Sequence, residues 1–283
     1  MTRGEAQQPA AESVSARPAA RRTAWRDLIT FRGAAQPRLE LWLSIAAFLL
    51  VLGAWTLVAE GGLVQPQILP SPFAVVAAWG RLFADGYIGD IGISVGRVWA
   101  AFLASAVIAI PLGILMSGYR AITALLEPII DFVRYLPVPA LVPLTLIWLG
   151  IGEGSKITLL WIGTFFQLIL LIADDARRVP KEFIETGRTL GASDTALMKD
   201  VLLRAMLPNM TDSLRITLGW CWTYLIVAEI VASSSGIGYE LWTARRYGKS
   251  PEVFAGILAI GIIGLVSDQA IRFLHRRWFR YLH

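Results

Sequence analysis

Residues 181–210 read KEFIETGRTLGASDTALMKDVLLRAMLPNM and form the longest polar break between apolar runs in the last two thirds of the chain. The stretch is too charged to cross a bilayer, because each Asp, Lys or Arg at the centre of a span costs about 2.5–3.5 kcal/mol on insertion scales. Its acids and bases alternate, so its charges nearly cancel. We therefore expect this stretch to lie at the membrane surface, held there by the hydrophobic helices on either side.

Local signals divide the stretch into two helical pieces that meet at Gly191. Pro180 suits the first position of a helix, and Gly191 can take the left-handed conformation that ends one. Ser193 or Asp194 can then cap the next helix. Apolar side chains recur at helical spacing in the second piece, at Leu197, Val201 and Leu202. These signals predict a helix–glycine–helix elbow over residues 180–204.

The composition indicates an all-α membrane protein. The 283 residues are 55% hydrophobic and 17% charged, with a mean hydropathy of +0.58, whereas soluble domains are about a quarter charged. The net charge of +5 fits cytoplasmic loops rich in Lys and Arg, and we expect no nucleic-acid binding. The single cysteine, Cys221, lies in an apolar run, so no internal disulfide forms, and we expect no metal site.

About six transmembrane helices are expected in one membrane domain over residues 39–283. Residues 1–38 are rich in Ala, Pro and Arg, which predicts a disordered cytoplasmic tail. An amphipathic piece, Phe73–Phe83, is expected along the outer surface, and residues 233–250 are expected to form an outer connection. The predicted spans are Leu41–Ala59, Ile93–Ser117, a third within Ile122–Ile151, Lys156–Ala173, Met210–Ala232 and Pro251–Leu274.

The third span contains four prolines, Pro128, Pro137, Pro139 and Pro143. Each proline removes a backbone donor and crowds the preceding turn. Within a membrane, broken backbone persists only where protein buries it or where it lines a wet cavity. We therefore expect a kinked span that faces a pathway.

The distribution of Lys and Arg sets the expected orientation. With a cytoplasmic N-terminus, the outer segments hold only Arg81, Arg245, Arg246 and Lys249. All other basic residues outside the spans fall on the inner side, which the positive-inside rule favours. Both termini and the elbow are then cytoplasmic.

The elbow carries a recognisable spacing. Glu185-Thr186-Gly187 is followed after three residues by Gly191, and after nine more by Val201-Leu202-Leu203. This pattern resembles the EAA motif of ABC importer permeases, which reads Glu-Ala-Ala, three residues, Gly, nine residues, Ile-x-Leu-Pro. Thr186 and Gly187 replace the two alanines, and Arg204 stands in place of the proline.

Other stretches extend the resemblance over residues 40–275. They are similar to the nitrate, sulfonate and taurine branch of these permeases. These stretches are Ile68–Pro72, Ser94–Val98, Leu136–Pro143, Trp148–Gly152, Ala228–Ile230 and Ser235–Tyr239.

The resemblance implies the type I importer fold in the bacterial inner membrane, with a small, anionic solute such as nitrate, a sulfonate or taurine. It further implies a homodimer of permeases, two cytoplasmic ATPase subunits and a periplasmic or lipid-anchored binding protein. ATP and Mg²⁺ would bind to the ATPase, and this chain would hold no cofactor and catalyse no reaction. Mapped onto this chain, the ATPase-coupling residues are Glu182, Phe183, Glu185, Thr186, Gly187, Arg188, Leu190, Gly191, Ala192 and Ser193. We also expect Glu185 to hold the elbow by accepting backbone N–H donors.

Charged and kinked positions inside the spans are the candidates for the pathway or its gate, because such charges are costly. They are Arg97, Asp131, Arg134, Pro137, Pro139, Arg215 and Glu229. Asp131 and Arg134 are spaced to pair on one helical face. Arg97 and Arg215 are expected to reach water near span ends, and Glu229 either braces the fifth span or gates.

Two other functions remain open. An ion-gradient-driven secondary transporter or channel would use Glu127, Asp131 or Glu229, and a membrane scaffold would transport nothing. We find no internal repeat, which many secondary transporters show, and the proline-broken span argues against a scaffold. Residues 150–157, GIGEGSKI, lack the spacing of a phosphate-binding loop, so we expect ATP hydrolysis on a partner.

Overall fold

The computed structural model describes residues 37–279, and this part of the chain is almost entirely helical, without strands. The predicted all-α class is confirmed. The predicted N-terminal tail, residues 1–38, lies almost wholly outside the described residues. The chain divides into two compact units, one up to Leu57 and one from Val58, which are described separately.

The first unit contains most of helix α2, Pro37–Glu60. Its 24 residues span about 36 Å at 1.5 Å per residue, enough for a bilayer core. Its large apolar side chains, including Trp42 and Phe48, are exposed. This helix corresponds to the predicted first span, Leu41–Ala59.

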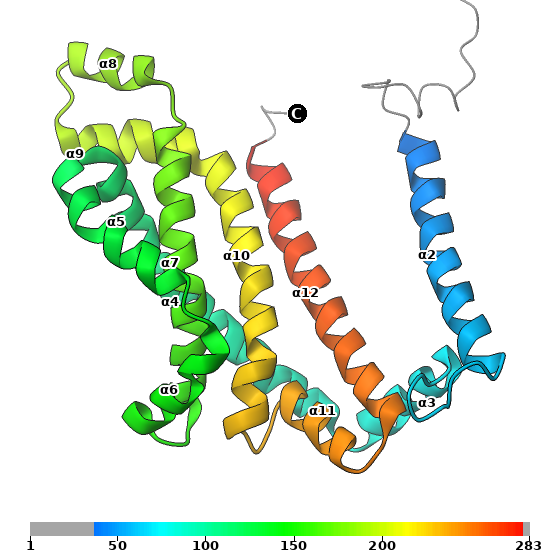
Figure 1. Cartoon of the computed structure of the whole chain (residues 1–283). Coiled ribbons are helices and arrows are strands. Elements are labelled where there is room, and N and C mark those ends of the chain that lie inside the picture. The colour runs from blue at the N-terminus through cyan, green and yellow to red at the C-terminus, as the bar shows by residue number, and fades with distance from the viewer. Residues whose placement is uncertain (1–36, 280–283) are drawn as a thin grey trace, which may run out of the picture. The chain divides into compact units, whose positions relative to one another are not determined.

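The second unit holds the remaining helices (Figure 1). In chain order they are α3 (Pro72–Ala84), α4 (Tyr87–Gly118), α5 (Arg120–Arg134), η1 (Val138–Leu141), α6 (Val142–Leu149), α7 (Glu153–Arg177), α8 (Lys181–Thr189), α9 (Asp194–Ala196), η2 (Leu197–Leu202), α10 (Leu203–Ala232), α11 (Ile237–Arg246) and α12 (Ser250–Trp278).

The core of this unit forms where α4, α7 and α10 pack together. One apolar cluster joins the three helices through Phe102, Leu160 and Leu225. A second cluster joins them nearer to α8 through residues such as Ile172 and Met206. Burial of these side chains fixes the three helices against one another, at roughly 25 cal/mol per Å² of apolar surface removed from solvent.

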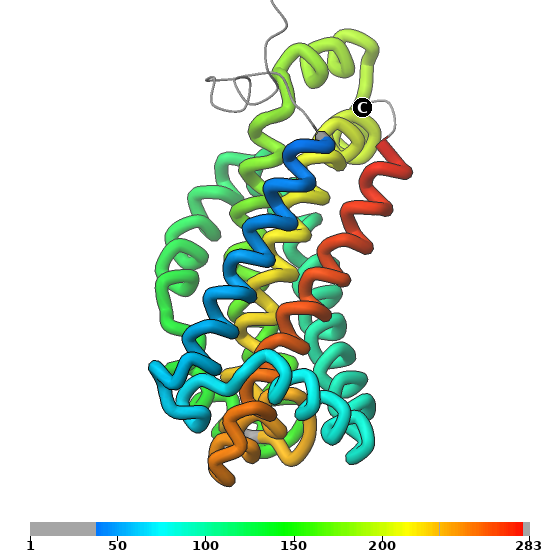
Figure 2. Tube along the Cα trace, turned by 90° about the vertical axis from the view of Figure 1, so that its right-hand side faces the viewer, coloured from blue at the N-terminus to red at the C-terminus, as the bar shows by residue number. Residues whose placement is uncertain are grey.

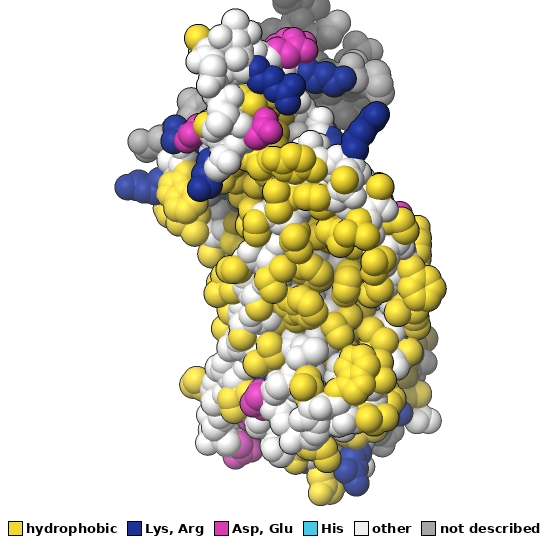
Figure 3. Space-filling view, turned by 90° about the vertical axis from the view of Figure 1, so that its left-hand side faces the viewer, with side chains coloured by type: hydrophobic (Ala, Val, Ile, Leu, Met, Phe, Trp, Pro, Cys, Tyr) yellow, Lys and Arg dark blue, Asp and Glu magenta, His cyan; other side chains and the backbone are white. Residues whose placement is uncertain are grey.

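The two ends of the unit differ. Figures 1 and 2 place α3 and α11 at one end, here called the α11 end, and α8 and α9 at the other, here called the elbow end. On the face in Figure 3, hydrophobic side chains form a broad band across the middle, and Lys and Arg gather at the elbow end. Such a band is typical of a surface that faces lipid.

The described residues include five helices long and apolar enough to cross a membrane, or six if the bent pair is one span. The bent pair is Arg120–Arg134 with Val138–Leu149, and its two parts meet at 93°. The predicted kink in the third span is therefore present, at Tyr135–Pro137. The region that we expected as a plain outer connection contains helix α11, whose ten residues were too short to give a clear apolar period.

Candidate functional site

The elbow begins with α8, which follows directly after Pro180 and ends in a hydrogen-bonded turn. The Ala192 N–H donates to the Gly187 carbonyl over 3.0 Å, and the Gly191 N–H donates to the Arg188 carbonyl over 2.9 Å. These two bonds define a Schellman motif. Gly191 supplies the left-handed residue of that motif, with φ of +80°. The predicted helix end at Gly191 is confirmed.

The second piece of the elbow packs back onto α8. A Cβ atom at Gly187 would lie 2.5 Å from the Leu197 Cδ2, so the absence of a side chain there lets the two pieces touch. The Ser193 Oγ accepts a hydrogen bond from the Ala196 N–H over 3.3 Å, which makes Ser193 rather than Asp194 the cap. The contact and the caps together hold α8 against the start of the following helix.

We expected the second piece of the elbow to be a short helix of its own, but it is the start of a longer helix. Asp194–Val231 is one continuous helix of 38 residues, and a π-helical turn, η2, lies near its start. The helix that contains the predicted fifth span, Met210–Ala232, therefore begins at Asp194, inside the predicted elbow. Pro208 lies inside α10, where it removes one backbone donor, while the buried Met206 and Met210 keep the helix packed.

Most of the predicted coupling residues are exposed. Gly187 is buried and Ala192 is half-buried, while the exposed members are Glu182, Phe183, Glu185, Thr186, Arg188, Leu190, Gly191 and Ser193. Two large apolar side chains stand out among them, because Phe183 is 52% and Leu190 is 82% exposed. The expected role of Glu185 in holding the elbow is wrong. The backbone hydrogen bonds of the Schellman motif hold the elbow instead, and Glu185 is exposed.

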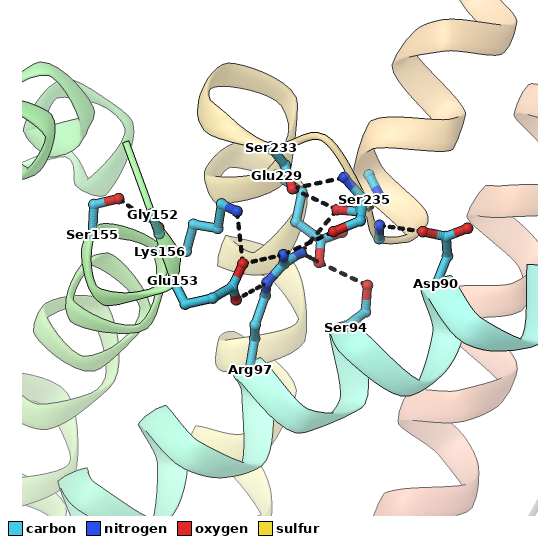
Figure 4. Close-up of polar contacts among 12 residues, drawn as sticks. Asp90, Ser94, Arg97, Gly152, Glu153, Ser155, Lys156, Glu229, Ser233 and Ser235 are labelled. Carbon is cyan, nitrogen blue, oxygen red and sulfur yellow. Dashed lines mark hydrogen bonds and ion pairs between the residues drawn. The ribbon is translucent and has the colours of Figure 1, made fainter. Parts of the chain in front are cut away.

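At the α11 end, Arg97 of α4 lies at the centre of a buried polar network (Figure 4). Its Nε and Nη2 each donate to one oxygen of the Glu153 carboxylate over 2.6 Å. Its Nη1 donates to the Glu229 Oε1 over 2.7 Å and to the Ser235 carbonyl over 2.9 Å. Nη2 also donates to the Ser235 Oγ over 3.3 Å.

All five N–H donors of a guanidinium are used in this arrangement. The side chain of Arg97 is only 2% exposed and that of Glu229 is fully buried. The prediction that Arg97 reaches water from a span end is therefore wrong: opposite charges at bonding distance replace the water. For Glu229 the contacts favour bracing, because they tie α10 to α4 and to the first turn of α11.

The segment after α10 is shaped around Glu229. Its Oε2 accepts from the Gly238 N–H over 2.7 Å, and its Oε1 accepts from the Ser94 Oγ over 2.7 Å. Gly236 has φ of +105°, and a Cβ there would lie 2.5 Å from the Glu229 Oε1. Only glycine fits a left-handed position so close to the ion pair.

Sequence reasoning missed several members of this network. Glu153 and Lys156 at the start of α7 were given no role in a site, yet Lys156 is buried and its Nζ donates to the Glu153 Oε1 over 2.9 Å. Asp90 accepts from the Gly236 N–H over 2.6 Å. Asp90 lies one helical turn before Ser94 and two turns before Arg97. This spacing in the sequence could have indicated that the three side chains share one face. Nearby on α11, burial raises the pKa of Glu240, and the Asp90 carboxylate adds to that rise.

The other candidate charges form pairs of their own. The Arg134 Nε lies 3.2 Å from the Asp131 Oδ1, which confirms the predicted pair. The Arg215 Nε lies 2.8 Å from the Asp268 Oδ1 on α12, and its Nη1 donates to Asp212. Arg215 is 19% exposed and is thus held by carboxylates rather than extended to water.

Pro137 and Pro139 are exposed at the break of the bent pair. The candidate pathway residues therefore do not converge on one site. Arg97 and Glu229 meet at the α11 end, Asp131 and Arg134 lie beside the break, and Arg215 lies between α10 and α12.

Apolar spans around a broken segment, with an exposed elbow at one end, define a polytopic membrane protein. The chain belongs to the family described as binding-protein-dependent transport system inner membrane component, whose model matches residues 109–280. It is 32% identical over 232 residues to the putative aliphatic sulfonates transport permease protein SsuC of Bacillus subtilis, covering 82% of this chain and 84% of that protein. It is 32% identical over 244 residues to the taurine transport system permease protein TauC of Escherichia coli, covering 84% and 89%.

A solved structure has the same fold. The inward-facing structure of the methionine ABC transporter MetNI matches with a TM-score of 0.57 and 20% identity, over 70% of this chain and 96% of that one. The resemblance to the sulfonate and taurine branch and the type I permease fold are thus confirmed. The chain is a multi-pass permease component of an ABC importer.

Proposed function

We propose that two copies of this chain form the pathway for a small anionic solute, and that α8 transmits the motion of a separate ATPase. In this proposal the elbow end and both termini face the cytoplasm. Two ATPase subunits bind beneath, where ATP and Mg²⁺ are held, and a periplasmic or lipid-anchored binding protein delivers solute at the α11 end. The clustering of Lys and Arg at the elbow end (Figure 3) supports that orientation.

The observation that carries this proposal is the build of the elbow. Helix α8 is joined to α7 by three residues, Arg178–Pro180, and is packed through Gly187 on the start of the long helix that becomes α10. A push on α8 therefore acts on two spans at once. Phe183 and Leu190 project from it as an exposed apolar pair that fits a groove on another protein.

The buried network supports the same mechanism from the opposite end. Through Arg97 it links α4, the start of α7, α10 and the segment before α11. Ion pairs with several partners resist gradual sliding, so the linked helices move as one body. Rigid-body rocking between inward- and outward-facing states is the motion that an ATPase can drive.

The solute class rests on the relatives and on one side chain. Two relatives are named for aliphatic sulfonates and for taurine, which are small sulfonates. Arg134, beside the break, has a side chain that is 32% exposed, and its guanidinium suits an oxyanion. The carboxylates that a secondary transporter would use are engaged, since Asp131, Glu229 and Glu127 each lie within 4.0 Å of an arginine.

Reconstitution tests the proposal. The chain is co-expressed with an ATPase subunit and a binding protein from the same transport system, and ATP-dependent uptake of ethanesulfonate is measured in proteoliposomes. The pair F183A and L190A is expected to abolish ATPase co-purification and uptake. The matched pair L63A and F73A removes similarly exposed side chains outside the elbow and is expected to retain ATPase binding. Uptake that proceeds without any ATPase would contradict the proposal.

A further inference from the structure

A cavity of about 340 Å³ lies where the bent pair meets α7 and α10. The side chains that set the polar and apolar chemistry of its lining are Arg134, Tyr135, Val138, Phe166, Gln167 and Tyr224. They come from both parts of the bent pair, from α7 and from α10, so the cavity lies beside the break in the third span. Its volume is at the lower end of the range for small-molecule sites, about 300–1,000 Å³.

The polar groups of this cavity have unused hydrogen-bonding capacity. The Arg134 Nη2 donates to the Tyr135 hydroxyl over 3.1 Å, and the Nε faces Asp131, which leaves the Nη1 donors. Within residues 37–279 the side-chain amide of Gln167 and the hydroxyl of Tyr224 have no hydrogen-bond partner. Gln167 and Tyr224 are half-buried, so a guanidinium, an amide and a phenol remain available to a ligand in the cavity.

The remaining walls are apolar and firmly placed. The ring of Tyr224 rests on Gly163, where an added Cβ would lie 2.6 Å from its Cδ2. Phe166 packs edge-on against Phe165 with ring centroids 5.0 Å apart, and Val138 is buried. The cavity thus pairs one cationic, donor-rich side with one aromatic and aliphatic side.

We propose that this cavity is a solute subsite that binds an organic anion, with its oxyanion head on Arg134 and Gln167 and its short apolar body against Phe166 and Tyr224. The inference rests on the proposed function and narrows it to organic sulfonates over nitrate. A three-oxygen inorganic anion would reach the guanidinium but would leave the apolar wall and most of the 340 Å³ without contact. An organic sulfonate would contact both the donor-rich side and the apolar side of the cavity.

Thiol labelling tests the subsite without requiring transport. The variant Q167C is made in a C221A background, since Cys221 is the only cysteine and is buried. In membrane vesicles it is treated with a sulfonate-bearing or a trimethylammonium-bearing methanethiosulfonate reagent. The sulfonate reagent is expected to react faster by about tenfold, the effect of one hydrogen bond to a charged group. Ethanesulfonate is expected to slow the reaction, and nitrate to slow it less.

Two variants of Arg134 test whether its charge causes the preference for the anionic reagent. R134Q in the same background is expected to remove the preference for the anionic reagent, and R134K to retain part of it. The control Y247C, exposed at the α11 end, is expected to show neither preference nor protection. No reaction at Q167C, or equal rates with both reagents, would overturn the subsite. Failure of the proposed function would appear instead as uptake without an ATPase, whatever the labelling shows.

Discussion

The elbow and the buried network are built in opposite ways. The elbow is exposed, and backbone hydrogen bonds between residues at most five apart, with one apolar contact, hold it. The network is buried, and side chains 56, 132 and 138 residues apart hold it. An exposed, locally built helix keeps its surface free for a partner, whereas a buried, long-range network can only bind helices of the same chain. In the proposed mechanism, the elbow receives the force from the ATPase and the network passes it between the helices.

The largest effect is expected from breaking the network at its centre. R97M leaves Glu229 as a buried, unpaired carboxylate, which costs roughly 3–5 kcal/mol. We expect loss of folded protein, measured by thermal unfolding in detergent and by expression level. The double variant R97M/E229M removes both charges and is expected to recover much of the stability. A stable R97M single variant would show that the network does not brace the helices.

Glu153, the exposed end of the network, gives a second test of whether the buried bonds stabilise the protein. Glu153 is 55% exposed, so E153Q is expected to cost less than R97M in the same unfolding measurement, because water can solvate what remains. Equal losses for the two variants would contradict a network whose strength lies in its buried half.

A middle-sized effect is expected where the elbow folds on itself. G187A places a Cβ 2.5 Å from the Leu197 Cδ2, and overpacking of this kind costs about 1–3 kcal/mol. We expect lower uptake with near-normal thermal stability of the spans. The compensating variant G187A/L197A makes room and is expected to restore uptake in part. If uptake does not recover in the double variant, the defect of G187A does not come from its contact with Leu197.

A smaller effect is expected at the helix end. Gly191 has φ of +80°, and a residue with a side chain costs roughly 1–2 kcal/mol there. G191A is expected to reduce uptake more than G191N, because Asn tolerates the left-handed region. The ratio of the two uptake rates is the measurement, and an equal reduction would mean that the turn's conformation is not what matters.

The smallest effect is expected at Arg204, where the related motif has proline. Its exposed ion pair with Asp200 spans 3.3 Å with side chains 74% and 62% exposed, and such pairs contribute about 0.3–0.5 kcal/mol. R204A is expected to leave thermal stability and uptake nearly unchanged. A large loss of uptake with normal stability would instead make Arg204 part of the docking surface.

The same contrast explains what sequence could predict. The spans followed from apolar runs, and the end of α8 followed from Gly191, because both depend on neighbouring residues. The bonds from Arg97 to Glu153, Glu229 and Ser235 depend on how four segments pack, which no local pattern encodes. The continuous helix through Pro208 was missed for the same reason, since burial of Met206 and Met210 overrides the local preference of proline.

The most direct test of the central claim is a cross-link from α8 to an ATPase. T186C, exposed on α8, is placed in the C221A background, and the co-expressed ATPase carries single cysteines along its membrane-facing groove. A cross-linked permease–ATPase product is expected from T186C, and none from Y247C at the α11 end. A co-purifying ATPase that never cross-links to T186C, while cross-linking elsewhere on the chain, would contradict the assignment of α8 as the coupling helix.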